Sequence, residues 1–366
     1  MRIVHARYLE PGMRLGKAVY APDGKILLKG GVSLTNGYIR NMERKNIPSV
    51  YIDDELSNGI EVEDAIDPEV KVQAVETIKN VFKTMSPNRN DKNRKGYVTN
   101  ESYKDVKNAI YQITNNLKKN NGSLFNMVEI MSTDLATYNH CVNVSVLAIM
   151  TARAMGLDEK RIMDIGVGAL MHDIGYAYVP SEIINKPGKL SDEEFEAIKK
   201  HTVYGYEMVK EDANISAIVK TIILMHHERL DGSGYPLRIK GDKINKFVRI
   251  VSICDMFEAL TSDRAYREKM PVYKALELLT AETTSKLDLE IYKNFIKNIA
   301  IYPQGTGVLL NTGEKGLVVE NNRNSPTRPK VRIIFNNEGN FYQGFKVVDL
   351  MKDLTTFIEN TCELRY

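Results

Sequence analysis

A long run of helical patterns, from Ser102 to about Leu289, constrains the fold of this chain more than any other feature. Apolar residues in it recur every three or four positions, which is the spacing of one buried helix face. The clearest instance is the set Val106, Ile110, Ile113 and Leu117. Ser191 followed by Glu194 has the form of a capping box and predicts the start of a further helix. We therefore expect an all-α core in this part of the chain.

Polar side chains that bind metals interrupt three of these apolar segments. His172-Asp173 follows Val167-Gly-Ala-Leu-Met, His226-His227 follows Ile222-Ile-Leu-Met, and Asp255 lies within Ile250-Val-Ser-Ile-Cys-Asp-Met-Phe. Burying an imidazole or a carboxylate without a partner is costly. A metal ion removes that cost, because neutral imidazole and ionised carboxylate are its ordinary ligands. The interruptions therefore favour a metal site inside the helical core.

Five of the six histidines of the chain lie in this helical region, and only His5 lies outside it. A single histidine such as His140 or His201 would more often be a hydrogen-bonded core or surface residue than a ligand. Two doublets and Asp255 in one helical domain make the metal site the stronger interpretation. Five histidines and two aspartates fit two ions with Asp173 bridging them. Nitrogen and oxygen ligands without thiolate indicate Fe, Mn, Co or Zn rather than Mg or Ca.

Composition narrows the partners and the compartment. The chain has 366 residues and a net charge of only +3, so no overall field indicates nucleic acid as a partner. No segment approaches the roughly 18 apolar residues of a membrane span, and the first residues lack a signal-peptide pattern. Three scattered cysteines suit a reducing compartment. We expect a cytoplasmic protein that binds neither nucleic acid nor membrane.

The length predicts two or three domains. The residue pattern changes on both sides of the helical run. Lys25-Ile-Leu-Leu-Lys and Ser49-Val-Tyr-Ile-Asp read as short strands of a β-containing module at residues 1–64. Connecting helices are expected at 65–130, including an amphipathic one from Asp67 to Met85 that could support a homodimer. The helical domain that carries the metal site would occupy 131–300. Glycines and apolar triplets after Tyr302 predict a small antiparallel β module at 301–366.

Several ordered motifs carry a family resemblance. They are His140 with Asn143-Val144, His172-Asp173-Ile-Gly, Asn185-Lys-Pro-Gly-Lys-Leu, Lys200-His201, His226-His-Glu-Arg-Leu-Asp-Gly-Ser-Gly-Tyr-Pro236, and Asp255 ahead of Leu260-Thr-Ser-Asp-Arg-Ala-Tyr-Arg267. Together they resemble the HD-GYP family of bacterial cyclic di-GMP phosphodiesterases. Glu10-Pro-Gly-Met-Arg14 resembles the small accessory module found ahead of such domains.

The resemblance implies the helical fold of the HD superfamily, a site of two or three metals that often holds iron or manganese, and hydrolysis of cyclic di-GMP to linear pGpG, GMP or both. Position by position, it makes the ligands His140, His172, Asp173, His201, His226, His227 and Asp255. It also implies that Tyr235 lies near the substrate and that Arg264 and Arg267 contact phosphate. Arginines at i and i+3 share a helix face, although a surface salt-bridge pair would have the same spacing.

Two positions depart from the family pattern. Tyr176 stands where the family usually has a lysine that reaches a substrate phosphate, so a cationic contact is lost and a phenol hydroxyl remains. We expect weaker substrate binding or slower reaction from this change. Ala136 stands where some members have a glutamate that supplies a third metal. We therefore expect two divalent ions, Fe or Mn.

As a mechanism we expect attack on phosphorus by a hydroxide that bridges the two ions, with Asp173 orienting the ions. Tyr176, Tyr235, Arg264 and Arg267 would contact the substrate. Two alternatives stay open. One is a low-activity sensor that binds a cyclic dinucleotide. The other is a phosphohydrolase for another cyclic dinucleotide, since nothing in the sequence indicates which base is recognised.

Overall fold

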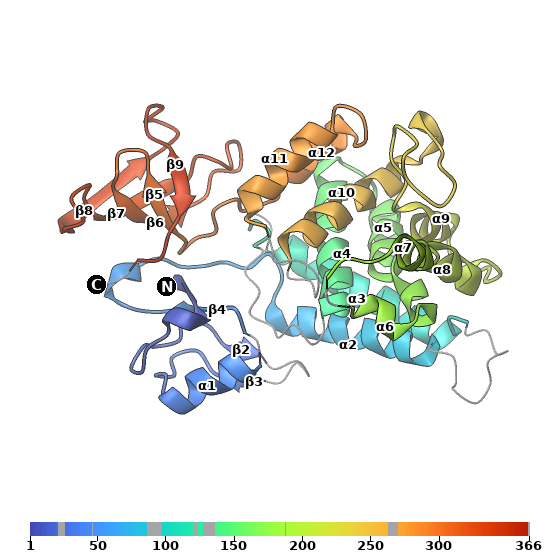
Figure 1. Ribbon diagram of the computed structural model, residues 1–366, viewed down its shortest axis with the longest axis horizontal. Coiled ribbons are helices and arrows are strands. Elements are labelled where there is room, and N and C mark those ends of the chain that lie inside the picture. The colour runs from blue at the N-terminus through green and yellow to red at the C-terminus, as the bar shows by residue number, and fades with distance from the viewer. Residues whose placement is uncertain are drawn as a thin grey trace. The chain divides into compact units, whose positions relative to one another are not determined.

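The computed structural model describes residues 1–20, 26–45, 47–85, 97–120, 123–126, 136–186, 188–262 and 270–364. The chain divides into two compact units. The helical unit comprises Ala65–Gly122 and Ala136–Asn298, and the β unit comprises Met1–Asp64, Ser123–Leu135 and Ile299–Tyr366. Both units are drawn in Figure 1, coloured along the chain.

The helical unit is built from long helices and short connecting turns. Its α-helices are α2 (Pro68–Met85), α3 (Asn100–Lys119), α4 (Ala136–Ala154), α5 (Glu159–Met171), α6 (Ser181–Ile184), α7 (Asp192–Lys199), α8 (His201–Val209), α9 (Ala217–Met225), α10 (Lys246–Thr261), α11 (Val272–Glu282) and α12 (Leu289–Ile296). The 3-10 turns η4 (Ile174–Tyr178) and η5 (Gly241–Lys243) connect some of them. Ser191 caps α7 with the capping box that the sequence predicts.

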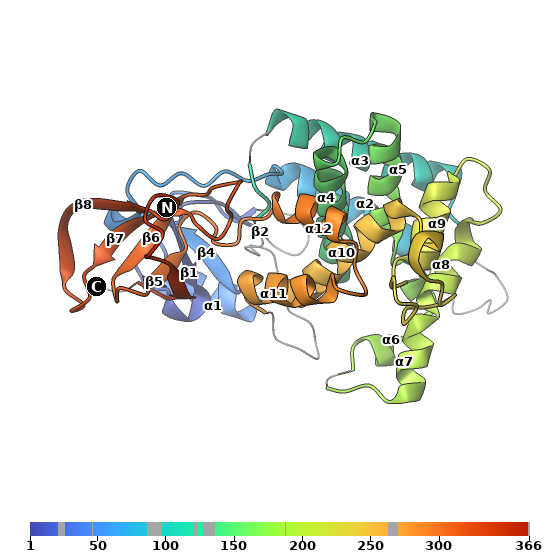
Figure 2. The same cartoon turned by 90° about the horizontal axis from the view of Figure 1, so that it is seen from above.

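Helix α4 forms the centre of this unit, because every residue from His140 to Ala152 is buried. A helix that is apolar all round can only lie in a core. It packs against α5 and α10, and α5 packs in turn against α9. Helices α6 and α7 lie at the edge of the unit, as the view from above shows (Figure 2). The central helices thus converge on one buried region and leave α7 beside an open surface.

The β unit contains two small sheets and one larger sheet. Strand β1 (Arg2–His5) pairs antiparallel with β4 (Ser49–Ile52), and β2 (Val19–Tyr20) pairs with β3 (Ile26–Leu28). Two 3-10 turns, η1 (Ala6–Tyr8) and η2 (Glu55–Ser57), and helix α1 (Asn36–Arg44) complete its first part. The larger sheet has the order β8-β7-β6-β5-β9 and is antiparallel throughout. Its strands are β5 (Gly307–Leu310), β6 (Lys315–Glu320), β7 (Lys330–Phe335), β8 (Phe341–Asp349) and β9 (Ile358–Thr361).

The two ends of the chain pack together in the β unit. The Ile3 amide donates to the Gly305 carbonyl at 3.0 Å. The Arg2 guanidinium, 5% exposed, donates to Asp54 at 2.7 Å and to the Leu364 carbonyl at 2.8 Å. Leu56 and Ile60 share a small core with Leu317, Ile334 and Leu364. The amino-terminal and carboxyl-terminal modules are therefore parts of one compact unit.

The predicted fold class is confirmed: a mainly helical protein with a small amino-terminal β-containing module and a carboxyl-terminal antiparallel β module. The strands expected around Ile26 and Ser49 are β3 and β4, and the helix expected from Asp67 is α2. Among the described residues, no helix has both the length and the apolar character needed to cross a bilayer. The predicted boundaries at 64, 130 and 300 stay predictions.

Candidate metal centre

The seven residues predicted as ligands lie together, and helix ends position most of them. His172 directly follows α5, His201 begins α8, His226 follows α9, and Asp173 precedes η4. His140 and Asp255 instead lie within the central helices α4 and α10. Six of the seven are no more than 5% exposed, and His227 is partly buried. The chain thus concentrates imidazoles and carboxylates in its most apolar region.

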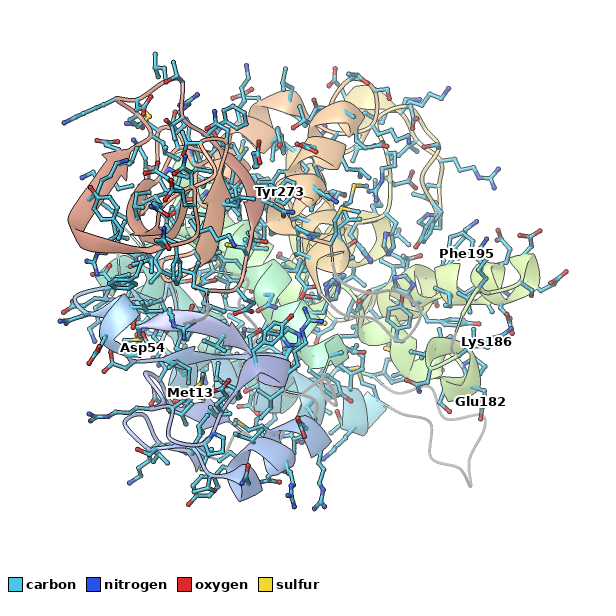
Figure 3. All side chains as sticks on the ribbon, turned by 60° about the vertical axis from the view of Figure 1, so that its left-hand side comes forward. Met13, Asp54, Glu182, Lys186, Phe195 and Tyr273 are labelled. Atoms are coloured by element: carbon cyan, nitrogen blue, oxygen red, sulfur yellow. The ribbon has the colours of Figure 1, made fainter. Side chains whose placement is uncertain are left out.

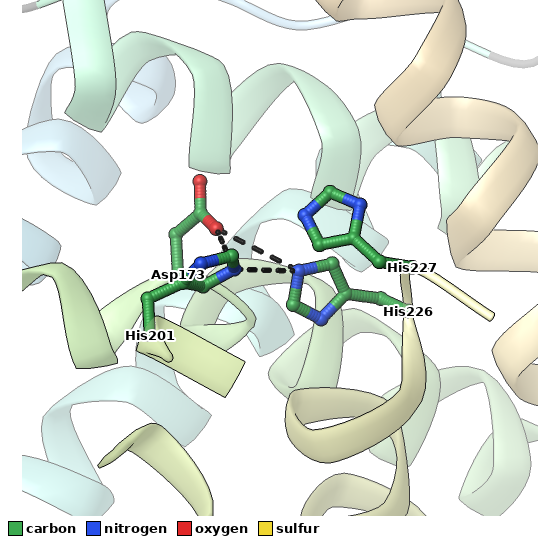
Figure 4. A group of neighbouring side chains, drawn as sticks. All are labelled: Asp173, His201, His226 and His227. Carbon is green, nitrogen blue, oxygen red and sulfur yellow. Dashed lines mark hydrogen bonds and ion pairs between the residues drawn. The ribbon is translucent and has the colours of Figure 1, made fainter. Parts of the chain in front are cut away.

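Asp173 lies at the centre of the group. Its Oδ1 is 3.3 Å from His201 Nε2 and 3.7 Å from His226 Nε2. Its Oδ2 is 3.2 Å from His172 Nε2 and 3.5 Å from His140 Nε2. Figure 4 shows dashed lines from one Asp173 oxygen to the rings of His201 and His226, with His227 beside them. Each carboxylate oxygen therefore faces its own pair of histidines.

Two sets of ligand atoms follow from this division. Asp173, His201, His226 and His227 place one ligand atom each within 4.8 Å of one another, and we call this the Oδ1 side. His140, His172 and Asp255 form a second such set, the Oδ2 side. Asp255 Oδ1 is 3.2 Å from His140 Nε2, and its Oδ2 is 3.6 Å from His227 Nδ1. Asp255 thereby touches both sides.

The outer nitrogens of the rings are held by acceptors. His172 Nδ1 and His201 Nδ1 each lie 2.7 Å from a backbone carbonyl, of Ala169 and Ile198. His226 Nδ1 lies 3.1 Å from the carbonyls of Ile222 and Ile223. A carbonyl only accepts, so each Nδ1 carries the proton and each Nε2 presents a lone pair inward. Fixing the tautomer in this way is typical of histidines that bind metals.

The inward-facing nitrogens also face one another. His172 Nε2 is 3.2 Å from His140 Nε2, and His201 Nε2 is 3.2 Å from His226 Nε2. Two lone pairs at that distance repel unless a proton or a cation lies between them. This donor set fits two divalent ions, one on each side of Asp173.

The electrostatics of the group favour the protonation states that metal binding requires at five of the ligands, and His172 is an exception. Burial lowers the pKa of His226 to about 3, and the neighbouring histidines contribute. Burial likewise lowers the pKa of His201 and, to a greater extent, that of His227. Burial alone would raise the pKa of Asp173 and Asp255, but the surrounding histidines lower both below the ordinary range. For His172, Asp173 outweighs burial and raises the pKa.

Two tyrosines flank the Oδ1 side. Tyr176 stacks on His201, with ring centroids 4.4 Å apart and planes 5° from parallel. Tyr235 stacks on His227 at 4.6 Å. Tyr176 thus lies directly beside the predicted ligands, where the family usually has lysine. Ala136, the other departure, begins α4 one turn before His140.

Two glycines of the motifs are required by close packing. A Cβ on Gly175 would lie 1.8 Å from the His201 carbonyl oxygen, so η4 can approach α8 only without a side chain there. A Cβ on Gly234 would lie 2.4 Å from the His227 carbonyl and 2.5 Å from the Glu228 Cα. Both glycines therefore allow the backbone that carries ligands to approach a neighbouring segment.

Sequence reasoning missed Glu258, a carboxylate only 1% exposed. It contacts His140 Nδ1, and it accepts from Asn143 Nδ2 at 3.0 Å and Ser262 Oγ at 2.7 Å. Its role is to hold the His140 ring, as carbonyls hold the rings of His172, His201 and His226. The available signal was its position in the apolar α10, one turn after Asp255.

Glu228 has a structural role in the loop that follows the histidines. It is 2% exposed and accepts from the backbone amides of Leu237, Arg238 and Ile239 at 2.6, 3.0 and 3.2 Å. These three hydrogen bonds replace the water that a buried carboxylate loses. Glu228 therefore closes the loop that carries Tyr235.

A cleft of about 730 Å³ opens beside His227, which is within the range of roughly 300–1,000 Å³ of small-ligand sites. Tyr235 and Arg229 line it, together with Phe195 and Lys199 of α7. Phe195 is 46% exposed and is labelled on α7 in Figure 3. The cleft thus combines aromatic rings with cations next to the predicted ligands. Arg264 and Arg267, the predicted phosphate contacts, lie outside the described residues.

Comparisons with known proteins agree with this architecture. Residues 104–291, slightly more than half of the chain, match the HD domain family, and residues 307–365 match a KOW domain associated with HD domains. An HDG"Y"P protein from Bdellovibrio bacteriovorus has a similar structure, with a TM-score of 0.51 and 18% identity over 80% of this chain and 97% of that one. The chain therefore belongs to the HD domain family.

Several curated relatives are named as phosphodiesterases of cyclic dinucleotides. A cyclic di-GMP phosphodiesterase of Pseudomonas aeruginosa is 34% identical over 65% of this chain and 58% of its own length. One of Thermotoga maritima is 34% identical over 48% of this chain and 49% of its own. A 3'3'-cGAMP-specific phosphodiesterase of Vibrio cholerae is 31% identical over 49% of this chain and 39% of its own. The chain thus spans about half the length of these relatives.

Proposed function

We propose that this protein is a metal-dependent phosphodiesterase that hydrolyses cyclic di-GMP to linear pGpG, GMP or both. The observation that carries the proposal is the arrangement around Asp173, in which each carboxylate oxygen faces two inward-pointing histidine nitrogens. The names of the Pseudomonas and Thermotoga relatives support the substrate. The cytoplasm as its compartment and a homodimer through α2 remain part of the proposal.

The centre would hold two divalent ions, Fe or Mn, through His140, His172, Asp173, His201, His226, His227 and Asp255. Ligands of nitrogen and oxygen without thiolate suit these metals. Two such ions supply an activated water at neutral pH and polarise the phosphoryl oxygens. Asp173 would hold both ions, and Asp255 would bind on the Oδ2 side.

The cleft supports a nucleotide as the substrate. Tyr235 and the exposed Phe195 offer aromatic faces, on which nucleobases stack with about 1–3 kcal/mol each. The Tyr176 hydroxyl would donate to a phosphate oxygen in place of the usual lysine, with a smaller contribution because it carries no charge. Arg264 and Arg267 would contact the phosphate that does not react.

The test is product formation by protein loaded with Mn²⁺ or Fe²⁺ and incubated with cyclic di-GMP. The double variant His172→Ala/Asp173→Ala should lose bound metal and hydrolysis together while its circular dichroism stays helical. His5→Ala, which removes the only histidine outside the group, is the matched control and should behave as the unmodified protein. Hydrolysis that survives in the double variant would contradict the proposal.

A sensor with little turnover is the second candidate, and Tyr176 is the observation that favours it. The ring lies flat on His201 and provides no cation next to the site. Saturable binding of cyclic di-GMP with no linear product over hours would support the sensor over the enzyme. Faster hydrolysis of 3'3'-cGAMP than of cyclic di-GMP would instead change the substrate.

A further inference from the structure

Arg229 is a cation of the cleft that lies within the motif from His226 to Pro236 but has no role in the predicted ligand set. It follows His226-His227-Glu228 directly and lines the cleft with His227 and Tyr235. Its side chain is partly buried. A guanidinium taken partly out of water requires a compensating anion or several acceptors.

The other partly buried cations of the cleft have such a compensating anion. Lys199 pairs with Glu196 at 2.6 Å, and Lys286 pairs with Glu282 at 2.8 Å. Arg229 has one hydrogen bond, from Nη1 to the Glu228 carbonyl at 3.1 Å. Over the described residues, no carboxylate oxygen lies within 4.0 Å of its guanidinium. Arg229 therefore retains most of its donors for a ligand.

Arg249, in the same part of the chain, is an arginine with a structural role and serves as a comparison. Its guanidinium pairs with Asp288 at 3.0 Å and with Asp242 at 3.1 Å. It also donates to the carbonyls of Ile244 and Gly241 at 2.8 and 3.1 Å. All three guanidinium nitrogens of Arg249 bond to the surrounding chain, whereas Arg229 uses only Nη1 in this way.

The backbone of Arg229 is nevertheless held in place. The Cα of Gly234 packs so closely that a Cβ there would lie 2.5 Å from the Arg229 amide nitrogen. Glu228, its neighbour, is fixed by three backbone amides of the same loop. A fixed backbone removes one source of entropy loss when the side chain binds a ligand.

We propose that Arg229 also binds the second phosphodiester of a cyclic dinucleotide, the one that is not held at the metal centre and that the proposed function assigns to Arg264 and Arg267. This inference rests on the proposed function and names a substrate contact for the same site. A planar guanidinium can donate two parallel hydrogen bonds to phosphate oxygens. A substrate with a single phosphodiester does not need this contact, so Arg229 selects for a ligand with two phosphates.

The experiment compares two substrates in the metal-loaded full chain. Cyclic di-GMP has two phosphodiesters, and bis(p-nitrophenyl) phosphate has one. Arg229→Met should raise KM for cyclic di-GMP roughly 10- to 100-fold, the effect of losing a charge-assisted hydrogen bond. Its kcat/KM for bis(p-nitrophenyl) phosphate should stay within about twofold. Arg229→Lys keeps the charge, so its KM for cyclic di-GMP should lie between that of Arg229→Met and that of the unmodified chain.

Arg161→Met is the matched control, because it removes the same charge from an exposed pair with Asp158 on α5. It should leave both substrates unchanged. Thermal unfolding of each variant reports any loss of fold. An unchanged KM for cyclic di-GMP in Arg229→Met, or equal losses for both substrates, would overturn the inference.

Failure of the proposed function gives a different result from failure of this inference. If the unmodified chain hydrolyses neither substrate, the proposed function fails, and binding of the hydrolysis-resistant bis-phosphorothioate analogue of cyclic di-GMP decides the role of Arg229. At least tenfold weaker binding by Arg229→Met than by the unmodified chain supports the inference. Equal binding, or binding by neither, overturns it.

Discussion

The two sides of the candidate metal centre are built differently. On the Oδ1 side, His201 and His226 rest on backbone carbonyls at the ends of helices. On the Oδ2 side, His172 also rests on a backbone carbonyl, but His140 lies within a helix and is held by the side chain of Glu258. A carbonyl is removed only by changing the backbone, whereas a carboxylate is removed by one substitution. The difference predicts that one side-chain substitution can remove the support of a ligand ring on the Oδ2 side, whereas no side-chain substitution removes the carbonyls that hold His201 and His226.

Asp173 is common to both sides, so its substitution has the largest expected effect. Asp173→Ala should remove both ions and lower hydrolysis of cyclic di-GMP by at least roughly 10³-fold, because both the ions and their common anion are lost. Metal content by mass spectrometry, together with product formation, checks this. If the variant kept one ion per chain with full affinity, the two sides would be independent of Asp173.

The metal-free protein should lose stability as the pH falls, and the Oδ1 side is the cause. Burial keeps the pKa of His226 at about 3 in the folded state, against about 6.5 unfolded. Between these values the unfolded chain binds a proton that the folded chain does not, so stability falls with falling pH. His201 and His227 add to this loss, while the raised pKa of His172 on the Oδ2 side opposes it.

Each histidine that stays neutral costs up to about 1.4 kcal/mol per pH unit below about 6.5. Urea denaturation in EDTA at pH 7.5 and pH 5.5 measures the sum. A lower free energy of unfolding at pH 5.5 is expected. Equal free energies of unfolding at pH 7.5 and pH 5.5 would show that the raised pKa of His172 offsets the lowered pKa values of the Oδ1-side histidines.

Glu258→Gln tests the Oδ2 side alone. The amide cannot hold the His140 ring as an anion does, so metal affinity on that side should fall by roughly 10- to 100-fold. Isothermal titration with Mn²⁺ should show one weakened site and one unchanged site. Glu159→Gln, an exposed glutamate paired with Lys118, is the control. Equal weakening of both sites would remove the distinction between the two sides.

Tyr176→Lys is expected to have the smallest effect. It restores a cation beside the Oδ1 side and should raise kcat/KM for cyclic di-GMP by roughly 3- to 10-fold, since hydrogen bonds from charged donors are stronger. Tyr176→Phe separates the hydroxyl from the ring and should lower kcat/KM slightly. A decrease with lysine would mean that stacking on His201 matters more than charge.

Much of the fold could be predicted because local patterns determine it. The spacing of apolar residues locates α2 and α3, and Ser191 with Glu194 marks the start of α7. The packing of the two chain ends into one β unit could not be predicted, because contacts such as Ile3 with Gly305 join residues far apart and leave no local pattern.

Most residues of the site could also be predicted from the sequence. Histidines and aspartates that interrupt apolar helices are conspicuous in sequence, and the structure brings all seven of them together. Glu258 was missed because one buried glutamate in a helix has many interpretations until its partner is known. Arg229 was missed because only the structure shows which arginines have no carboxylate within ion-pair distance among the described residues.

The central claim is that two ions bind on opposite sides of Asp173. Anomalous diffraction from crystals grown with Mn²⁺ tests it most directly. The structure predicts two peaks about 3.5–4 Å apart, one bounded by His201, His226 and His227 and the other by His140, His172 and Asp255. A single peak, or a pair that does not have Asp173 between them, would contradict it.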